Sequence, residues 1–410
     1  MTRFLLILVS VLCLNPFHSI AHAELDEQLQ SVLEKGLRKH GAKGVSAAIV
    51  FPDGSLWTSA SGISHDTVAM QPDMLFAIGS VTKNIMAALV LRLAEENELS
   101  LDDSLAQWLP AFPHVDPSIT IRQLLNHTSG LYMYWQNDDI WKDLKKDRTK
   151  VWTPKDVLSY IKEPYFAPGG GWRYSNTNYL LLAMLVEKAT GNRLSEVMRQ
   201  FFWEPLTISS AFLSTGNGLP ENMAHVYGDN FQPGEVERDI TSLPRASHES
   251  IGFGSSGLFM RSSDLALWCH RLFEGQVLRE SSMAEMLSFV DFRPVANMRA
   301  YGLGVQLFKR KLSSGKDAIG HAGGNIGSTT YMVYLPEYHL SVVVMVNAFA
   351  NKSADTITRG LIRKVLRHQG EVGPLPYVPF MPYGFIGLCS IMSAIGVNYY
   401  LYRRRKAATV

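Results

Sequence analysis

The stretch Phe76–Lys83 has the sequence FAIGSVTK and places the hydroxyl of Ser80 three residues before the amine of Lys83. The apolar residues that follow predict a helix, on which residues i and i+3 share one face. The Lys83 amine is therefore expected to reach the Ser80 hydroxyl. Burial and the positive end of the helix dipole both disfavour a charged ammonium, so a neutral Lys83 can act as general base for a serine nucleophile.

Two further motifs carry polar groups in an order that suits acyl transfer. The first is WRYSNTNY at residues 172–179, and the second is GHAGG at residues 320–324. The pKa of a free phenol is about 10, and we expect a cationic neighbour to lower it so that Tyr174 serves as acid and base. Asn176 is expected to give amide hydrogen bonds to the lysine or the substrate. The glycines of the last motif let a substrate lie against the backbone.

In these motifs the chain resembles the serine β-lactamase-related hydrolases, the group of class C β-lactamases, D,D-peptidases, D-aminopeptidases and esterases. The resemblance runs from about Leu25 to Arg367 and also includes LLNHTSGL at 124–131, GSSGL at 254–258, RSSDL at 261–265, YGLG at 301–304 and YLPE at 334–337. It implies the following site: the nucleophile Ser80, the general base Lys83, the acid/base Tyr174, and substrate or oxyanion contacts from Asn176, His321, Gly323 and Gly324.

Two residues depart from the pattern of this group. Ala322 has no hydroxyl where serine or threonine is common, and His321 stands where many members have lysine. An imidazole has an unperturbed pKa near 6.5, so His321 is mostly neutral at pH 7. Both changes remove partners for a substrate carboxylate. We therefore expect cleavage of an ester or amide, with peptidoglycan-derived peptides among the candidates, and weak or absent β-lactamase activity.

The same residues also have purely structural interpretations, without a role in catalysis. Ser80 alone could be a helix N-cap and Lys83 a solvated surface lysine. His127 is expected to be structural, in the exit loop of a short helix that Thr120 caps and that runs through Leu125. The alternative function is a membrane-tethered binding or scaffold protein that keeps the fold without turnover, and the intact motif residues argue against it.

The composition is that of a globular enzyme of 410 residues with a formal net charge of +2. With a net charge this close to neutral and no lysine patch interleaved with aromatic residues, nucleic acid is not expected as a partner. Cys269 is the only cysteine outside the two apolar ends, which excludes an intramolecular disulfide in the folded part. The chain has no helical HExxH pair, and the glycines at 252–257 lack the framing of a dinucleotide fingerprint, so neither a metal nor a cofactor is expected.

The two ends predict export and a membrane anchor. Residues 1–23 have the pattern of a signal peptide, and a hydrolase domain is expected over 24–370. A linker at 371–379 leads to an apolar transmembrane stretch at 380–402, and the basic tail at 403–410 is expected on the cytoplasmic side. The catalytic domain is therefore expected outside the cytoplasm, in the periplasm or on the outer face, with lipid as a partner of the anchor.

The fold class that these patterns favour is α/β (α+β), with one antiparallel sheet built from both chain ends, flanking helices and an inserted, mainly helical lobe. Strands are expected near 45–51 and 56–61 at one end, and near 317–321, 329–335 and 340–347 at the other. Helices are expected at 25–39 and 354–367, with a largely helical middle from 81 to about 289. The site is expected where sheet and lobe meet.

Overall fold

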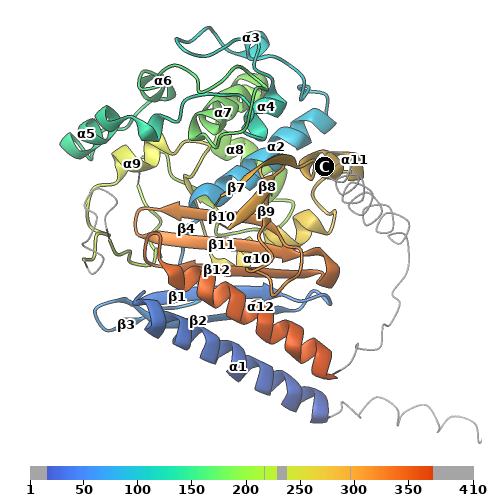
Figure 1. Cartoon of the computed structure of the whole chain (residues 1–410). Helices are drawn as coiled ribbons and strands as arrows, with labels where there is room; N and C mark the ends of the chain where they lie inside the picture. The colour runs from blue at the N-terminus through green and yellow to red at the C-terminus, as the bar shows by residue number, and fades with distance from the viewer. Residues whose placement is uncertain (1–15, 217, 229–237, 296, 373–410) are drawn as a thin grey trace, which may run out of the picture.

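The computed structural model describes residues 16–216, 218–228, 238–295 and 297–372. Within them, a nine-stranded antiparallel sheet is assembled from both ends of the chain, as the sequence predicts (Figure 1). In spatial order the strands are β3 (Val68–Ala69), β2 (Leu56–His65), β1 (Gly44–Val50), β12 (Leu340–Val346), β11 (Ser328–Leu335), β10 (Ile319–Asn325), β9 (Gln306–Phe308), β8 (Met298–Tyr301) and β7 (Val290–Val295).

The centre of the sheet is buried on both faces. Strand β1 pairs with β12 in a register that places Val45 opposite Val346 and Ala48 opposite Val343. Every residue of these two strands is buried, and their sequences are rich in valine. Such continuous β-branched runs suit a strand that is covered by helices on both sides.

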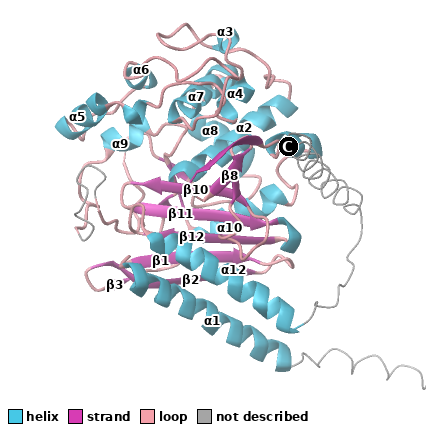
Figure 2. Ribbon diagram, viewed as in Figure 1, coloured by secondary structure: helices cyan, strands magenta, loops and turns pink. Residues whose placement is uncertain are grey.

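Helices cover the two faces unequally. On one face, α1 (Pro16–His40) and α12 (Lys352–Val372) lie side by side, and Leu29, Leu33, Ile357 and Leu361 join the core beneath them (Figure 2). On the other face, α10 (Ser262–Phe273) packs on β12, β1 and β11. A larger core continues from there into the helical lobe.

The lobe lies between the two sheet-forming ends of the sequence, as predicted. Its helices are α2 (Thr82–Glu95), α3 (Leu105–Trp108), α4 (Ile121–Leu125), α5 (Asp138–Lys146), α6 (Pro154–Leu158), α7 (Asn176–Thr190), α8 (Leu194–Met198), α9 (Ala246–Ile251) and α11 (Glu280–Met286). Short helical turns are η1 (Gly79–Val81), η2 (Tyr134–Gln136), η3 (Arg199–Trp203) and, in the sheet region, η4 (Pro336–Tyr338). A small second sheet contains β4 (Phe76–Ala77), β6 (Leu258–Met260) and β5 (Phe212–Leu213).

The sequence did not predict strands β7 to β9. These strands are short and their pairing shifts register between Asp291 and Val295 and between Met298 and Ala300. Such irregularities interrupt the alternation by which a strand is recognised. Helix α1 also starts earlier than predicted, at Pro16, within the expected signal peptide.

No helix in the described ranges is long and apolar enough to cross a membrane. The predicted transmembrane stretch at 380–402 and the tail at 403–410 lie outside the described residues, as do residues 1–15 of the predicted signal peptide.

Candidate active site

Ser80 lies in the helical turn η1, directly before α2, at the junction of sheet and lobe. The residue before it, Gly79, has φ +55°, a left-handed conformation that glycine adopts without steric cost. The turn presents the Ser80 side chain with partial exposure, while Lys83 sits one turn later on α2. The predicted apolar helix therefore exists, and it holds both residues.

Lys83 is fully buried, and its amine contacts the nucleophile. Its Nζ lies 3.1 Å from the Oγ of Ser80 and donates a hydrogen bond to the carbonyl of Ser255 at 2.8 Å. The rings of Tyr174 and Tyr179 lie 5.0 and 5.6 Å from the same Nζ. No ion pair to a carboxylate is recorded for this amine among the described residues, and burial lowers its pKa well below the ordinary value. A neutral amine can accept the serine proton.

Tyr174 lies beside the Lys83 amine, but its acidity differs from the prediction. Burial raises the pKa of this phenol well above its ordinary value, although a hydrogen bond to Ser80 works in the opposite direction. The expected lowering by a cationic neighbour was wrong, because the Lys83 amine beside the ring is itself driven toward neutrality. Tyr174 is therefore a protonated phenol that can donate a proton.

The third motif brings a strand backbone against the nucleophile turn. A Cβ added to Gly323 would lie 2.1 Å from the carbonyl oxygen of Ile78 and 3.0 Å from the amide nitrogen of Ser80. A Cβ added to Gly79 would lie 2.7 Å from the amide nitrogen of Gly324. Only glycines permit this approach. The backbone at Gly323 and Gly324 thus lies against the turn at Gly79 and Ser80, and the resemblance assigns the N–H groups of Ser80 and Gly324 to the oxyanion hole.

The edge of β10 explains which way the Gly324 N–H points. Strand β9 pairs with β10 only at residues 319 and 320, so the rest of this edge is not covered by β9. Alternate N–H groups of a strand point to the same edge. The N–H of Ala322 donates to Oε1 of Gln306 at 3.0 Å on that edge. Gly324 is two residues further along the strand, so its N–H points to the same edge.

His321 is buried and does not act as a cation. Its Nε2 lies 3.0 Å from the hydroxyl of Tyr301, and its Nδ1 lies 2.6 Å from the carbonyl oxygen of Ala322. Burial, and to a lesser degree the nearby Lys83, lower the pKa of His321 to about 3. The imidazole is neutral at pH 7, as expected. Its assignment as a substrate contact remains a prediction.

Ala322 faces away from this cluster. Its side chain packs with Tyr331 against the core under α1 and α12, on the opposite side of the sheet. A hydroxyl at this position would therefore begin on the α12 side.

Asn176 is the first residue of α7 and is buried. Its backbone N–H lies 2.9 Å from the Sδ of Met133, while its side-chain Oδ1 has no hydrogen-bond partner among the described residues. The predicted bond between this amide and Lys83 is not among the recorded contacts of the lysine, which are to Ser80 and Ser255. A buried, unpaired acceptor is costly unless another molecule satisfies it.

Several residues around the lysine were not predicted as site residues. The carbonyl of Ser255 orients the amine, and its segment 254–258 was recognised only as part of the resemblance. The rings of Tyr174 and Tyr301 lie 4.3 and 4.8 Å from that of His127. The sequence did contain a signal for this aromatic cluster, because Tyr301 and His127 begin the segments YGLG and HTSG that the resemblance includes.

His127 lies in the predicted exit loop of α4, whose N-terminus Thr120 caps as expected. Its Nδ1 lies 3.3 Å from the N–H of Ser175 and 2.9 Å from the amide nitrogen of Asn178. It thus ties this loop to the segment that carries Tyr174, which agrees with the structural interpretation. Burial lowers the pKa of His127 well below its ordinary value.

The described residues contain no group of three or more histidine, cysteine, aspartate or glutamate side chains that could hold a metal ion. Cys269 is buried in α10, and burial raises the pKa of its thiol to about 12.

A model of the family described as Beta-lactamase matches residues 29–367. The chain belongs to this family. Penicillin-binding protein 4* of Bacillus subtilis (strain 168) is 27% identical over 356 residues, which are 83% of this chain and 75% of that protein. Esterase EstB of Burkholderia gladioli is 32% identical over 261 residues, covering 59% of this chain and 65% of the esterase.

Among solved structures, a D-stereospecific amidohydrolase from Streptomyces sp. superposes with a TM-score of 0.70. It is 28% identical to this chain, and the match covers 82% of this chain and 97% of that one. The chain spans somewhat less than two thirds of the esterase at 65%. The antiparallel sheet with an inserted helical lobe is thus a fold that this chain shares with the amidohydrolase.

Proposed function

We propose that the protein is a hydrolase that forms an acyl-enzyme on Ser80 and releases it with water. The observation that carries this proposal is the 3.1 Å contact between Nζ of Lys83 and Oγ of Ser80. A buried amine with a lowered pKa beside a partly exposed hydroxyl is the arrangement that activates a serine.

Each step then has a group within reach. Lys83 takes the proton from Ser80 as its oxygen attacks the carbonyl carbon. The N–H groups of Ser80 and Gly324 hold the oxyanion. The Tyr174 phenol gives its proton to the leaving oxygen or nitrogen and recovers it from the Lys83 ammonium. In deacylation the same two residues remove a proton from water and return one to Ser80.

The proposed substrate class rests on the relatives of this chain and on two side chains of the site, Asn176 and His321. The names of the relatives include an esterase and a D-stereospecific amidohydrolase, which suggests an ester or amide for this chain. The unpaired Oδ1 of Asn176 is suited to accept an N–H of an amide substrate. A neutral His321 offers no charge to a substrate carboxylate. This supports weak or absent β-lactamase activity, and peptidoglycan-derived peptides remain candidates.

The location rests on the sequence alone. Export by the signal peptide at 1–23 and anchoring by the apolar stretch at 380–402 would place the domain outside the cytoplasm, with the basic tail at 403–410 inside.

The test is intact-protein mass spectrometry of the full chain after incubation with a fluorophosphonate or with a penicillin. The fluorophosphonate is expected to add one covalent group to the wild type and none to Ser80→Ala, while penicillin adds little or none. Lys83→Ala is expected to lose labelling to a similar degree, because residues that act as one unit are not additive. Undiminished labelling of Ser80→Ala would refute the nucleophile, and an unlabelled, folded wild type would favour the scaffold alternative.

A further inference from the structure

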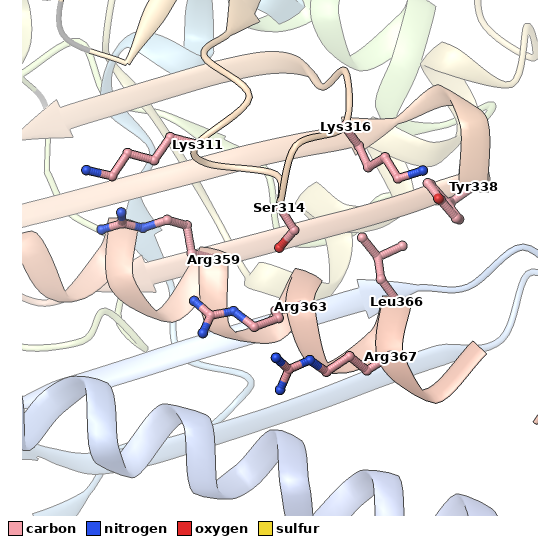
Figure 3. Close-up of a pocket in the computed structure, with 8 residues that line it drawn as sticks. All are labelled: Lys311, Ser314, Lys316, Tyr338, Arg359, Arg363, Leu366 and Arg367. Carbon is pink, nitrogen blue, oxygen red and sulfur yellow. The ribbon is translucent and has the colours of Figure 1, made fainter. Parts of the chain in front are cut away.

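A strongly basic cavity lies on the face of the sheet that α12 covers, opposite the active site. It has a volume of about 580 Å³ and is bounded by α12 and the loop at 309–317 that precedes β10. Figure 3 shows arginines in succession along α12, facing lysines and a serine of the loop. Its five cations are Lys311, Lys316, Arg359, Arg363 and Arg367. We call this cavity the basic groove.

The charge of the basic groove is only partly neutralised. Arg359 pairs with Asp355, and Lys316 pairs with Glu337 at 3.1 Å. The remaining three cations, Lys311, Arg363 and Arg367, have no recorded ion pair or hydrogen bond within the described ranges, and all three are exposed. None of the described residues that line the groove is acidic. An anion that enters would therefore meet about three unpaired positive charges.

The arrangement suits phosphate groups. Arg359, Arg363 and Arg367 recur every four residues, so they share one face of α12. At a rise of about 1.5 Å per residue they span roughly 12 Å along the helix axis. The planar fork of a guanidinium pairs with phosphate through two parallel hydrogen bonds. Tyr338 and Leu366 add apolar surface to the same cavity, which suits a ligand that carries both a phosphate and a carbon skeleton.

The place of the groove in the chain indicates the source of that phosphate. Arg367 lies near the end of α12, which stops at Val372. Only residues 373–379 separate this end from the apolar stretch that starts at Phe380, and seven residues reach about 25 Å at most. If the stretch is an anchor, as proposed above, the end of α12 is held close to a bilayer surface.

We propose that the basic groove binds the phosphate headgroups of anionic lipids at the membrane surface from which the anchor emerges. The groove then orients the domain on the bilayer, whereas the apolar stretch only tethers it. Because the interaction is electrostatic, it weakens as salt shortens the screening length.

The experiment uses the full chain in neutral detergent micelles and measures binding of a short-chain fluorescent phosphatidylglycerol. The test variant is Lys311→Gln/Arg363→Gln/Arg367→Gln. The charge-matched control is Lys145→Gln/Lys146→Gln/Lys155→Gln, which removes three exposed lysines from the lobe. Since a hydrogen bond between charged partners contributes roughly a factor of ten or more, the test variant is expected to bind at least about tenfold more weakly. The control and wild type are expected to bind alike, with equal hydrolytic activity in all three proteins.

Two competitors distinguish a lipid phosphate from a soluble phosphate as the ligand. Phosphatidylcholine of the same chain length and inorganic pyrophosphate are each expected to displace the probe poorly. Equal binding by the test variant, or equal displacement by phosphatidylcholine, would overturn the proposal. Displacement by pyrophosphate as effective as that by unlabelled phosphatidylglycerol would show that a soluble phosphate is the ligand and would overturn the lipid source. Binding in micelles does not require residues 380–402 to span a bilayer, so failure of the anchor and failure of the groove give different results.

Discussion

The hydroxyl of Tyr301 lies 3.0 Å from Nε2 of His321, and the imidazole tautomer decides which of the two groups donates. Nδ1 faces the carbonyl oxygen of Ala322 at 2.6 Å, so Nδ1 carries the hydrogen and Nε2 accepts from the phenol. A second proton on Nε2 would reverse the direction of the bond to Tyr301 and place a charge in a buried cluster. Burial, and to a lesser degree the nearby Lys83, disfavour this charge and lower the pKa of His321 to about 3.

The first prediction concerns the pH dependence of substrate choice. An unperturbed histidine titrates between about pH 5 and pH 8, whereas His321 stays neutral throughout that range. The preference for neutral substrates over matched substrates with a carboxylate beside the scissile bond is expected to stay constant there. The ratio of kcat/KM for the two substrates measures it. Improved turnover of the carboxylate substrate on lowering the pH to about 6 would show that His321 does become charged.

The second prediction concerns the stability cost of the buried lysine. The pKa of Lys83 is lowered in the fold, so between that value and the ordinary 10.5 the unfolded chain binds more protons at this residue. Stability rises with pH where the unfolded state binds more protons. Lys83→Met is therefore expected to be inactive but more stable than the wild type at pH 7, with the difference shrinking as the pH rises toward 10.5. Urea unfolding across a pH series measures this difference, and a pH-independent gap would contradict the lowered pKa.

The third prediction compares two neighbouring glycines. A Cβ at position 323 meets the backbone oxygen of Ile78 at 2.1 Å, which cannot yield without moving the nucleophile turn. A Cβ at position 324 meets the ring of Phe349 at 3.0 Å, and that side chain is exposed and can turn away. Gly323→Ala is expected to lose most turnover, while Gly324→Ala loses far less. Comparable kcat values for the two variants would show that β10 does not constrain Ser80.

The fourth prediction concerns His127, which holds the loop of Tyr174. His127 has φ +64°, a conformation that asparagine tolerates better than alanine. His127→Asn keeps an acceptor near the N–H of Ser175 and the amide of Asn178, whereas His127→Ala leaves both buried donors unpaired at a cost of about 1–3 kcal/mol each. We expect the alanine variant to lose stability by this amount and to lose kcat, and the asparagine variant to recover much of both. Equal unfolding free energies and kcat values in the two variants would contradict this role.

Much of the fold follows from local patterns in the sequence. Strands β1, β11 and β12 are rich in β-branched residues, and all three were recognisable because such runs are typical of buried strands. The irregular strands β7 to β9 were not predictable, since register shifts near Val295 and Ala300 break the period of two.

The candidate site was likewise predictable from the sequence only in part. The spacing of Ser80 and Lys83 predicts their contact because one helix carries both residues. The raised pKa of Tyr174, the lowered pKa of His321 and the bond from Lys83 to the Ser255 carbonyl were not predictable. These properties depend on burial, and burial is created by segments that are more than a hundred residues apart in the sequence.

The last prediction tests how the chain is held at a membrane. An apolar stretch of the length of 380–402 binds by burial of its side chains and not by charge, so the full chain is expected to stay with membranes after alkaline and high-salt washing. Replacing Ile391 and Ile395 by lysine places two charges near the middle of the stretch, where each costs about 2.5–3.5 kcal/mol. Ile391→Lys/Ile395→Lys is therefore expected to appear in the alkaline supernatant, while the matched Ile391→Leu/Ile395→Leu stays in the pellet. Release of the wild type by salt alone would mean that the basic groove, and not the apolar stretch, is what retains the protein, because salt screens charges but does not weaken apolar burial.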